Sequence, residues 1–282
     1  MRHLPEIHHT SDSVWRDPRA FVTEFRRDLA KAPELAWQLF MRNVRARYRQ
    51  SFTGYIWALI PPLAWAALFL ALRSAGQLSG TGGSNYTAYL VVGLVFWQVF
   101  IESAQTPLRV FAEARPMLAK LRFPREALVG AALLEVGFQF LIRVPLLLVA
   151  WFITPEATAA GWWLLLPSLA SLVAAGSFIG IALLPLSMLY DDVAAALALA
   201  SGFWLLITPV AYVVRADGFA ARLAAWNPAA ILVNVARSWW LGEGQADGTA
   251  FSLVAVGAVL ATGLAWMVAR VAFPHLIARF GS

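Results

Sequence analysis

The sequence predicts an all-α integral membrane protein with six transmembrane helices per chain. Of its 282 residues, 60% are hydrophobic and 13% are charged, whereas soluble domains carry about 25% charged residues. The mean hydropathy is +0.65. The apolar residues gather in six long segments, and a bilayer core of about 30 Å needs roughly 20 such residues as a helix.

The residues before the first apolar segment predict two regions. Residues 1–32 are polar and lack the apolar centre of a signal peptide, so we expect a cytoplasmic N-terminal tail. Residues 33–53 predict an amphipathic helix at the membrane interface, with Trp37 and Phe40 on one side. The alternative is an ordinary basic anchor with no further role. Arginines line its polar side and its end: Arg42, Arg45, Arg47 and Arg49.

Residues 54–273 predict the transmembrane domain, followed by a cytoplasmic tail over residues 274–282. Pro61 and Pro62 remove backbone donors inside the first span and predict a bend there. A bend suits the wall of a transport pathway, although proline is common in membrane helices generally. The predicted spans are Gly54–Leu72, Tyr86–Phe111, Ala127–Ile153, Trp162–Leu189, Val193–Val213 and Ala250–Phe273.

The basic residues predict the orientation of the chain. Of 22 Lys and Arg, ten lie in the first 53 residues, five in the connection after the second span and two near the C-terminus. Excess positive charge marks the cytoplasmic side, so we expect a multi-pass membrane protein with both termini in the cytoplasm. The pI of 10.2 then reflects topology and attraction to anionic membrane lipids rather than nucleic-acid binding.

Charged residues inside the predicted spans are costly, at about 2.5 to 3.5 kcal/mol each on insertion scales. Away from the ends of the spans, three such residues are present: Glu102, Glu135 and Arg143. They either form a polar patch that faces a conduit or pair across spans and hold helices together. The chain contains no cysteine, and its four histidines lie near the termini, so we expect no thiolate metal site and no buried histidine metal site.

Aromatic residues recur at helical spacing in the first and fifth spans. Sugar rings stack on aromatic planes, and such stacking tolerates sliding, as base stacking does for single-stranded nucleic acid. These rings are candidates for a translocation channel, and the alternative is that they face lipid or pack a dimer. The candidates are Trp57, Trp65, Phe69, Phe203, Trp204 and Tyr212.

Two connections carry structure of their own. The connection 109–126 predicts a short amphipathic helix with Pro116 in its first turn. A helix of this kind can bind in a groove of a partner protein. The alternative is a solvated basic loop. Its candidate residues are Glu113, Arg115, Pro116, Leu118, Lys120, Arg122, Phe123 and Arg125.

The segment 215–248 holds two apolar pieces, Phe219–Trp226 and Pro228–Leu241, and neither could cross the bilayer alone. Asn227 is expected to cap the second piece, with Pro228 in its first turn. The two pieces are expected on the external side of the membrane, where one possibility is an amphipathic hairpin on the membrane surface.

Several stretches together resemble one protein family. "RYRQSFTGYIWALIPPL", "MLAKLRFPREAL", "LYDDV" and "NPAAILVNVAR" resemble, in this order, the membrane subunits of ABC transporters that export O-antigen, teichoic acid or capsule. The resemblance runs from Trp37 to the C-terminus. The chain departs from the family at Thr53, usually aliphatic, at Val129, often proline, and at Asp191, often arginine. The change at Asp191 alters the charge of a turn expected near the ATPase.

The resemblance implies a homodimeric permease of the bacterial inner membrane, with two copies of a nucleotide-binding ATPase on its cytoplasmic face. It implies transport, with no catalytic residue in this chain. It implies that 109–126 is a coupling helix and that 215–248 forms a pair of re-entrant helices. It also implies that the arginines of residues 42–49 bind the headgroup of a lipid-linked polysaccharide, for which O-antigen is the first candidate. The chain has no GxxxxGK[ST] loop, so we expect no cofactor in it, with ATP and Mg²⁺ bound by the partner.

Three other functions remain open as alternatives. Within the same class, the chain could be a permease for a small molecule or drug, or for teichoic acid or capsule. A membrane-embedded lipid–sugar transferase would need clustered carboxylates or histidines, and only Asp191 and Asp192 are adjacent. An ion-coupled transporter would usually show an internal repeat, and none is evident.

Overall fold

The computed structural model describes residues 18–49, 54–76, 85–120, 124–154, 159–212, 226–242 and 248–280. Every regular element in these ranges is a helix, which confirms the all-α class. The elements are α1 (Pro18–Arg49), η2 (Gly54–Ala58), α2 (Ile60–Ser74), α3 (Tyr86–Lys120), α4 (Arg125–Phe152), η3 (Ala159–Leu164), α5 (Leu165–Leu189), α6 (Asp192–Ile207), α8 (Pro228–Leu241) and α9 (Gly248–Phe280).

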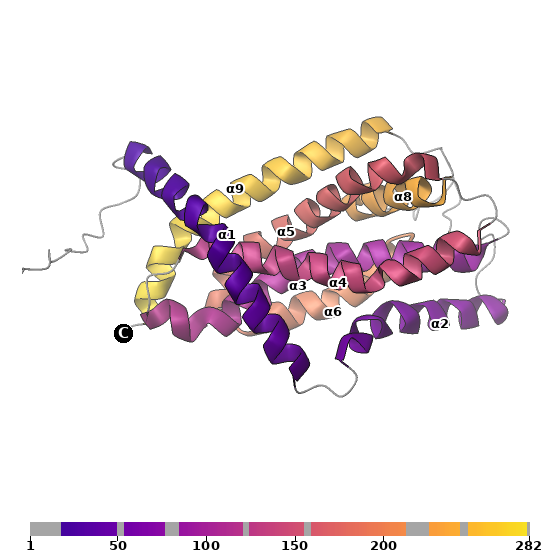
Figure 1. Ribbon diagram of the computed structural model, residues 1–282, viewed down its shortest axis with the longest axis horizontal. Coiled ribbons are helices and arrows are strands. Elements are labelled where there is room, and N and C mark those ends of the chain that lie inside the picture. Colours follow the sequence, from indigo (N-terminus) through magenta and orange to yellow (C-terminus); the bar gives the residue numbers. More distant parts are fainter. Residues whose placement is uncertain are drawn as a thin grey trace, which may run out of the picture.

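One bundle contains six helices that run in alternating directions along its long axis (Figure 1): α2, α3, α4, α5, α6 and α9. The helix α1 crosses one end of this bundle obliquely, and α8 lies at the opposite end. We name these two ends the α1 end and the α8 end. The ends of α3, α5 and α9 and the starts of α4 and α6 therefore lie at the α1 end.

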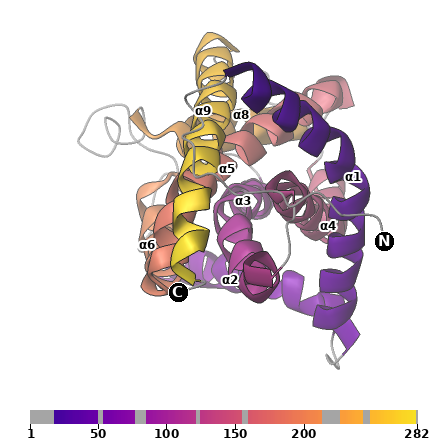
Figure 2. The same cartoon turned by 90° about the vertical axis from the view of Figure 1, so that its left-hand side faces the viewer.

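The helix α3 is the centre of the bundle, as the end-on view in Figure 2 shows. It packs against α2, α4, α5, α6, α8 and α9. Of its most apolar stretch, 72% is buried inside the protein, against 11% for α9. The helix α9 therefore presents most of its apolar surface to the surroundings, as a lipid-facing helix does.

Two glycines of α5 allow it to approach α3 closely. A Cβ atom on Gly176 would lie 2.2 Å from the carbonyl oxygen of Phe100, and one on Gly180 would lie 2.4 Å from that of Ala104. Real Cβ atoms do not come so near to backbone atoms. Small residues four apart let membrane helices pack backbone to backbone, so this pair fixes the contact at the core of the bundle.

Within the described ranges, four helices are long and apolar enough to cross a bilayer: Tyr86–Leu118, Arg125–Phe152, Trp162–Leu189 and Gly248–Phe273. The predicted first and fifth spans are the shorter apolar helices α2 and α6, with 15 and 16 residues. At about 1.5 Å per residue, 15 residues extend roughly 22 Å, less than a bilayer core of about 30 Å.

The first span breaks where a bend was predicted, but the prolines lie at the start of a helix rather than inside one. Pro61 and Pro62 occupy the first turn of α2, and Gly54–Ala58 forms the separate 3₁₀ helix η2. Proline is tolerated in a first turn because the backbone N–H it lacks has no partner within the helix there. The break therefore shortens the regular helix of this span.

Both predicted polar tails are partly helical. The helix α1 begins at Pro18 rather than at residue 33 and continues through Pro33, while α9 continues to Phe280. Apolar residues recur at helical spacing through Phe25, Leu29 and Ala32, a signal that extends the amphipathic pattern backwards. The side chains of Ala36 and Phe40 are buried in the cluster that joins α1 to α4.

Candidate functional site

The buried carboxylate of Glu135 on α4 joins three helices near the α1 end. Its oxygens accept hydrogen bonds from Asn43 Nδ2 at 2.9 Å, Arg47 Nη2 at 3.1 Å and Arg109 Nη2 at 2.7 Å. Asn43 and Arg47 belong to α1 and Arg109 to α3. The side chain of Glu135 is 2% exposed, whereas those of Arg47 and Arg109 are each 36% exposed. Paired in this way, the carboxylate is stabilised where a lone charge would be costly.

A cavity of about 490 Å³ lies beside this cluster. Residues from α1, α3, α4 and α6 line it, among them Arg47, Glu102, Gln105, Arg109 and Gln139. Its volume is within the range of about 300 to 1,000 Å³ found for small-molecule sites. Two guanidinium groups and two amide side chains therefore border one space at the α1 end.

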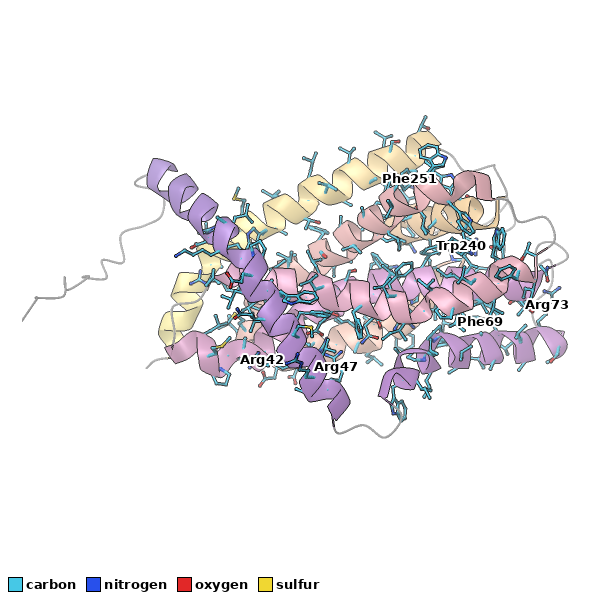
Figure 3. All side chains as sticks on the ribbon, viewed as in Figure 1. Arg42, Arg47, Phe69, Arg73, Trp240 and Phe251 are labelled. Atoms are coloured by element: carbon cyan, nitrogen blue, oxygen red, sulfur yellow. The ribbon has the colours of Figure 1, made fainter. Side chains whose placement is uncertain are left out.

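Of the four arginines predicted to meet a headgroup, the structure describes the side chains of three, and these lie in two places. Arg47 is bound to Glu135 beside the cavity. Arg42 and Arg45 lie on the outward face of α1, where they and Trp37 line an open hollow of about 550 Å³. Figure 3 shows Arg42 and Arg47 on the same stretch of α1. The side chain of Arg49, at the end of α1, lies outside the described residues.

The other charges predicted inside the spans pair across helices. Arg143 on α4 is 1% exposed, and its Nη1 donates to Glu102 of α3 at 2.6 Å, with Nη2 contacting the second carboxylate oxygen. Its Nε donates to the carbonyl oxygen of Ala58 at 3.0 Å. Of the two possibilities for Glu102, Glu135 and Arg143, the structure shows pairing across helices, and Glu102 also borders the cavity.

The candidate channel aromatics do not share one environment. Phe69 is buried, and Trp65 and Trp204 pack against the same cluster around α3. Trp204 meets Phe100 of α3 edge to face, with ring centroids 5.2 Å apart. Trp57 and Phe203 are exposed, and the hydroxyl of Tyr212 donates to the carbonyl oxygen of Leu206. The side chains of Trp65, Phe69 and Trp204 thus pack in or against the hydrophobic core of the chain, while those of Trp57 and Phe203 face outward.

The predicted coupling segment is mostly the end of α3. Residues 109–120 continue that helix through Pro116, where a separate short helix was expected. Proline in a helix interior removes one hydrogen bond but does not always end the helix. Glu113 and Pro116 are exposed there and Leu118 is buried. The side chain of Lys120 lies outside the described residues, as do Arg122 and Phe123 entirely.

The end of α3 is fastened to the turn between α5 and α6. The guanidinium of Arg115 donates to Asp191 at 2.5 Å and to the carbonyl oxygen of Ser187 at 2.5 Å. Asp191 is one of the three positions at which the chain departs from the family that it resembles. Here its acidic side chain supplies the partner for Arg115, an interaction that an arginine at this position could not make.

A further cluster at the α1 end joins the start and the end of the chain. Arg270 of α9 donates to Glu126 of α4 at 2.6 Å and to Asp28 of α1 at 2.9 Å. The guanidinium of Arg125 lies over the ring of Phe273, 5.2 Å from its centroid. No sequence pattern indicates these roles of Asp28, Asn43 and Arg270, because pairing between distant positions leaves no periodic signal.

The second apolar piece of the external segment has the predicted start. Asn227 caps α8, its side chain accepts from the N–H of Ala229 at 3.1 Å, and Pro228 follows in the first turn. The helix ends at Gly242, whose φ of 77° is left-handed and therefore favours glycine. Trp240 donates to the carbonyl oxygen of Leu147, and Figure 3 shows Trp240 at the α8 end. Residues 219–225 of the first piece lie outside the described residues.

A bundle of long apolar helices with ion pairs between them is the architecture of a multi-pass membrane protein. The chain belongs to the ABC-2 type transporter family, whose characteristic domain matches residues 34–240. This family consists of ABC transporter permeases.

Relatives of the chain are proteins that export polysaccharides. An O-antigen export system permease protein RfbA of Klebsiella pneumoniae is 27% identical over 121 residues, which cover 43% of this chain and 46% of the relative. The RfbA permease of Myxococcus xanthus is 28% identical over 44% of this chain and 46% of its own length. The polysialic acid transport protein KpsM of Escherichia coli is 24% identical over 40% and 44%. The chain thus spans about half the length of the curated relatives it matches.

Proposed function

We propose that the chain is the membrane permease of an ABC exporter that moves a lipid-linked polysaccharide from the cytoplasmic side across the inner membrane. The observation that carries this proposal is the similarity to O-antigen export permeases from two organisms. O-antigen is therefore the first candidate substrate. The similarity to a polysialic acid transport protein makes a capsular polysaccharide the second.

The charge distribution supports one orientation. Of the basic side chains that the structure describes, most lie at the α1 end: Lys31, Arg42, Arg45, Arg47, Arg109, Arg115, Arg125 and Arg270. Arg73 and Arg237 lie at the α8 end. Because cationic ends face the cytoplasm, we place both termini and the α1 end inside. The helices α2 and α6 then complete six spans, and α8 is a re-entrant helix at the outer face.

The partner in this proposal is a separate ABC ATPase, present in two copies and docked at the α1 end of a homodimer. The end of α3 and the turn before α6 form one connected surface there, through Arg115 and Asp191. ATP and Mg²⁺ belong to the ATPase. The exposed arginines of α1, Arg42 and Arg45, face anionic headgroups of membrane lipids or of the substrate, and nucleic acid has no part in the function.

Deleting the gene in its host tests this function. We expect loss of surface polysaccharide on carbohydrate-stained gels and accumulation of lipid-linked polymer inside the cell, both restored by the intact gene. Loss of O-antigen with intact capsule supports the first candidate, and the reverse result supports the second. Unchanged surface polysaccharide together with new drug sensitivity would reject both in favour of a drug exporter.

A further inference from the structure

The cavity beside Glu135 has features of an anion site. Arg47 and Arg109 reach it from different helices, and Gln105 and Gln139 add amide groups to its lining. The guanidinium group presents a planar fork of donors that matches carboxylate and phosphate oxygens. In the structure these two forks meet one carboxylate, that of Glu135.

The charges of the described side chains around the cavity do not cancel. Arg143 and Glu102 neutralise each other as a pair, and Glu135 offers a single negative charge to the two guanidinium groups of Arg47 and Arg109. Glu113 also approaches Arg109, at 3.6 Å, but its side chain is half exposed. Solvent screens such an exposed pair strongly, so the two arginines retain attraction for a further anion.

We propose that this cavity binds the phosphate group of a lipid-linked substrate, and that Glu135 holds its two arginines in place until that phosphate displaces it. This inference rests on the proposed function and adds where the headgroup binds. A phosphate ester or diphosphate carries more negative charge and more acceptor oxygens than one carboxylate. It therefore competes well for Arg47 and Arg109, which are each about a third exposed.

Displacement has a structural consequence for α1. The bond between Arg47 and Glu135 is one of two that join this part of α1 to the buried carboxylate, with Asn43 making the other. When a phosphate binds Arg47 in place of Glu135, the hydrogen bond from Asn43 to Glu135 remains, but the ion pair of Arg47 is lost. The end of α1 next to η2 is then held less tightly. Binding of phosphate in the cavity is in this way linked through Arg47 to movement of the bent first span.

Binding to the purified full chain tests the inference. The probe is farnesyl diphosphate, a short polyprenyl diphosphate, added to the protein in phosphatidylcholine nanodiscs; farnesol and inorganic pyrophosphate are compared. Arg47→Gln and Arg109→Gln should each weaken binding about tenfold, the factor expected for a hydrogen bond between charged groups. Lys31→Gln, an exposed cation elsewhere on α1, should leave the affinity unchanged.

Glu135→Gln gives the decisive result. It keeps an acceptor for Asn43 but removes the competing charge, so we expect tighter binding of farnesyl diphosphate, by about tenfold. A merely structural role for Glu135 predicts equal or weaker binding, and that result in folded protein overturns the inference. Equal competition by nanodiscs that contain phosphatidylglycerol would also overturn it, because the site would then accept any phospholipid.

Cysteine protection provides a second test that needs no change of charge. The chain has no native cysteine, and Ala194 of α6 lines the cavity, whereas Ala196 on the same helix is exposed and does not line it. Farnesyl diphosphate should slow maleimide labelling of Ala194→Cys but not of Ala196→Cys. Equal labelling of Ala194→Cys with and without the probe overturns the inference even if Glu135→Gln does not fold.

These tests fail separately from the proposed function. If the deletion strain loses surface polysaccharide but farnesyl diphosphate does not bind, the inference is wrong and the exporter assignment stands. If the diphosphate binds with the expected pattern but the deletion strain keeps its polysaccharide, the phosphate site stands and the polysaccharide assignment is wrong.

Discussion

A single buried side chain, Arg143, supports the break in the first apolar segment. In a continuous helix the carbonyl oxygen of Ala58 would accept from the N–H of residue 62, but Pro62 has no N–H. Arg143 Nε donates to this oxygen, and the rest of its guanidinium is paired with Glu102. A charge that is costly inside a membrane thus satisfies a carbonyl group that the prolines leave without its usual donor.

We expect Arg143→Met to lower the free energy of unfolding by about 3 to 5 kcal/mol, because it leaves the Glu102 carboxylate without its partner. The double variant Arg143→Met/Glu102→Leu should recover much of this loss, since both charges are then absent. Arg45→Met, on the exposed face of α1, should change stability by about 0.5 kcal/mol or less. Unfolding in mixed micelles measures all three, and equal losses for Arg143→Met and Arg45→Met would contradict the pairing.

At the scale of elements, the contact between α3 and α5 depends on two glycines. Gly176 and Gly180 let the backbones meet, and any side chain there would strike the carbonyl oxygen of Phe100 or Ala104. Backbone atoms in the middle of a membrane helix move only if the whole helix moves. The position of α5, and with it the turn that holds Asp191, therefore depends on residues without a side chain.

We expect Gly176→Ala to destabilise the protein by about 1 to 3 kcal/mol or more, the usual cost of overpacking a core. Gly257 of α9 is a matched control, because nothing lies within 4 Å of a Cβ atom added there. Alanine at position 257 should be neutral or stabilising by up to about 1 kcal/mol. Melting temperatures in detergent compare the two, and similar behaviour of both variants would argue against the close contact.

The link between the end of α3 and the α5–α6 turn should matter for function more than for stability. Asp191 is 85% exposed, and exposed ion pairs contribute about 1 kcal/mol or less. Asp191→Arg should therefore leave the melting temperature nearly unchanged but separate the two parts of the proposed docking surface. We expect less ATPase to co-purify with this variant, and unchanged co-purification would exclude the link from docking.

At the scale of the whole molecule, the two ends of the bundle differ in charge. The α1 end carries most of the described cations, while α8, η3 and their tryptophans occupy the other end. The rings of Trp162 and Trp240 stack there with centroids 5.3 Å apart. Tryptophan concentrates at membrane interfaces, so the distribution of charge and of aromatic rings indicates a membrane axis along the bundle.

The absence of cysteine makes this orientation simple to measure. Ser74, at the end of α2, and Lys31, on α1, are both exposed. In intact cells a membrane-impermeant maleimide should label Ser74→Cys. It should label Lys31→Cys only after the membrane is permeabilised, because the α1 end faces the cytoplasm in the proposed orientation. Labelling of Lys31→Cys in intact cells would show the opposite orientation and would place the proposed docking surface for the ATPase outside the cytoplasm.

The sequence predicted the helical class, the long spans and the cap of α8, because hydropathy, periodicity and Asn227–Pro228 act within short windows. It did not predict which charges meet. Glu135 binds Arg109, 26 residues away, and Arg47, 88 residues away, and only packing of whole helices brings such positions together. The separate start of α2 was also missed, since a proline pair is compatible with a kink or with a new helix.

The contact of Arg270 with Asp28 and Glu126 has a consequence for biogenesis. Arg270 leaves the ribosome after α1 and α4, the two helices that it bridges. Until α9 emerges, two carboxylates at the same end lack this guanidinium, and the docking of α1 is incomplete. Synthesis order therefore keeps α1 loosely attached until α9 has been made, so that a chain terminated before residue 270 lacks this bridge.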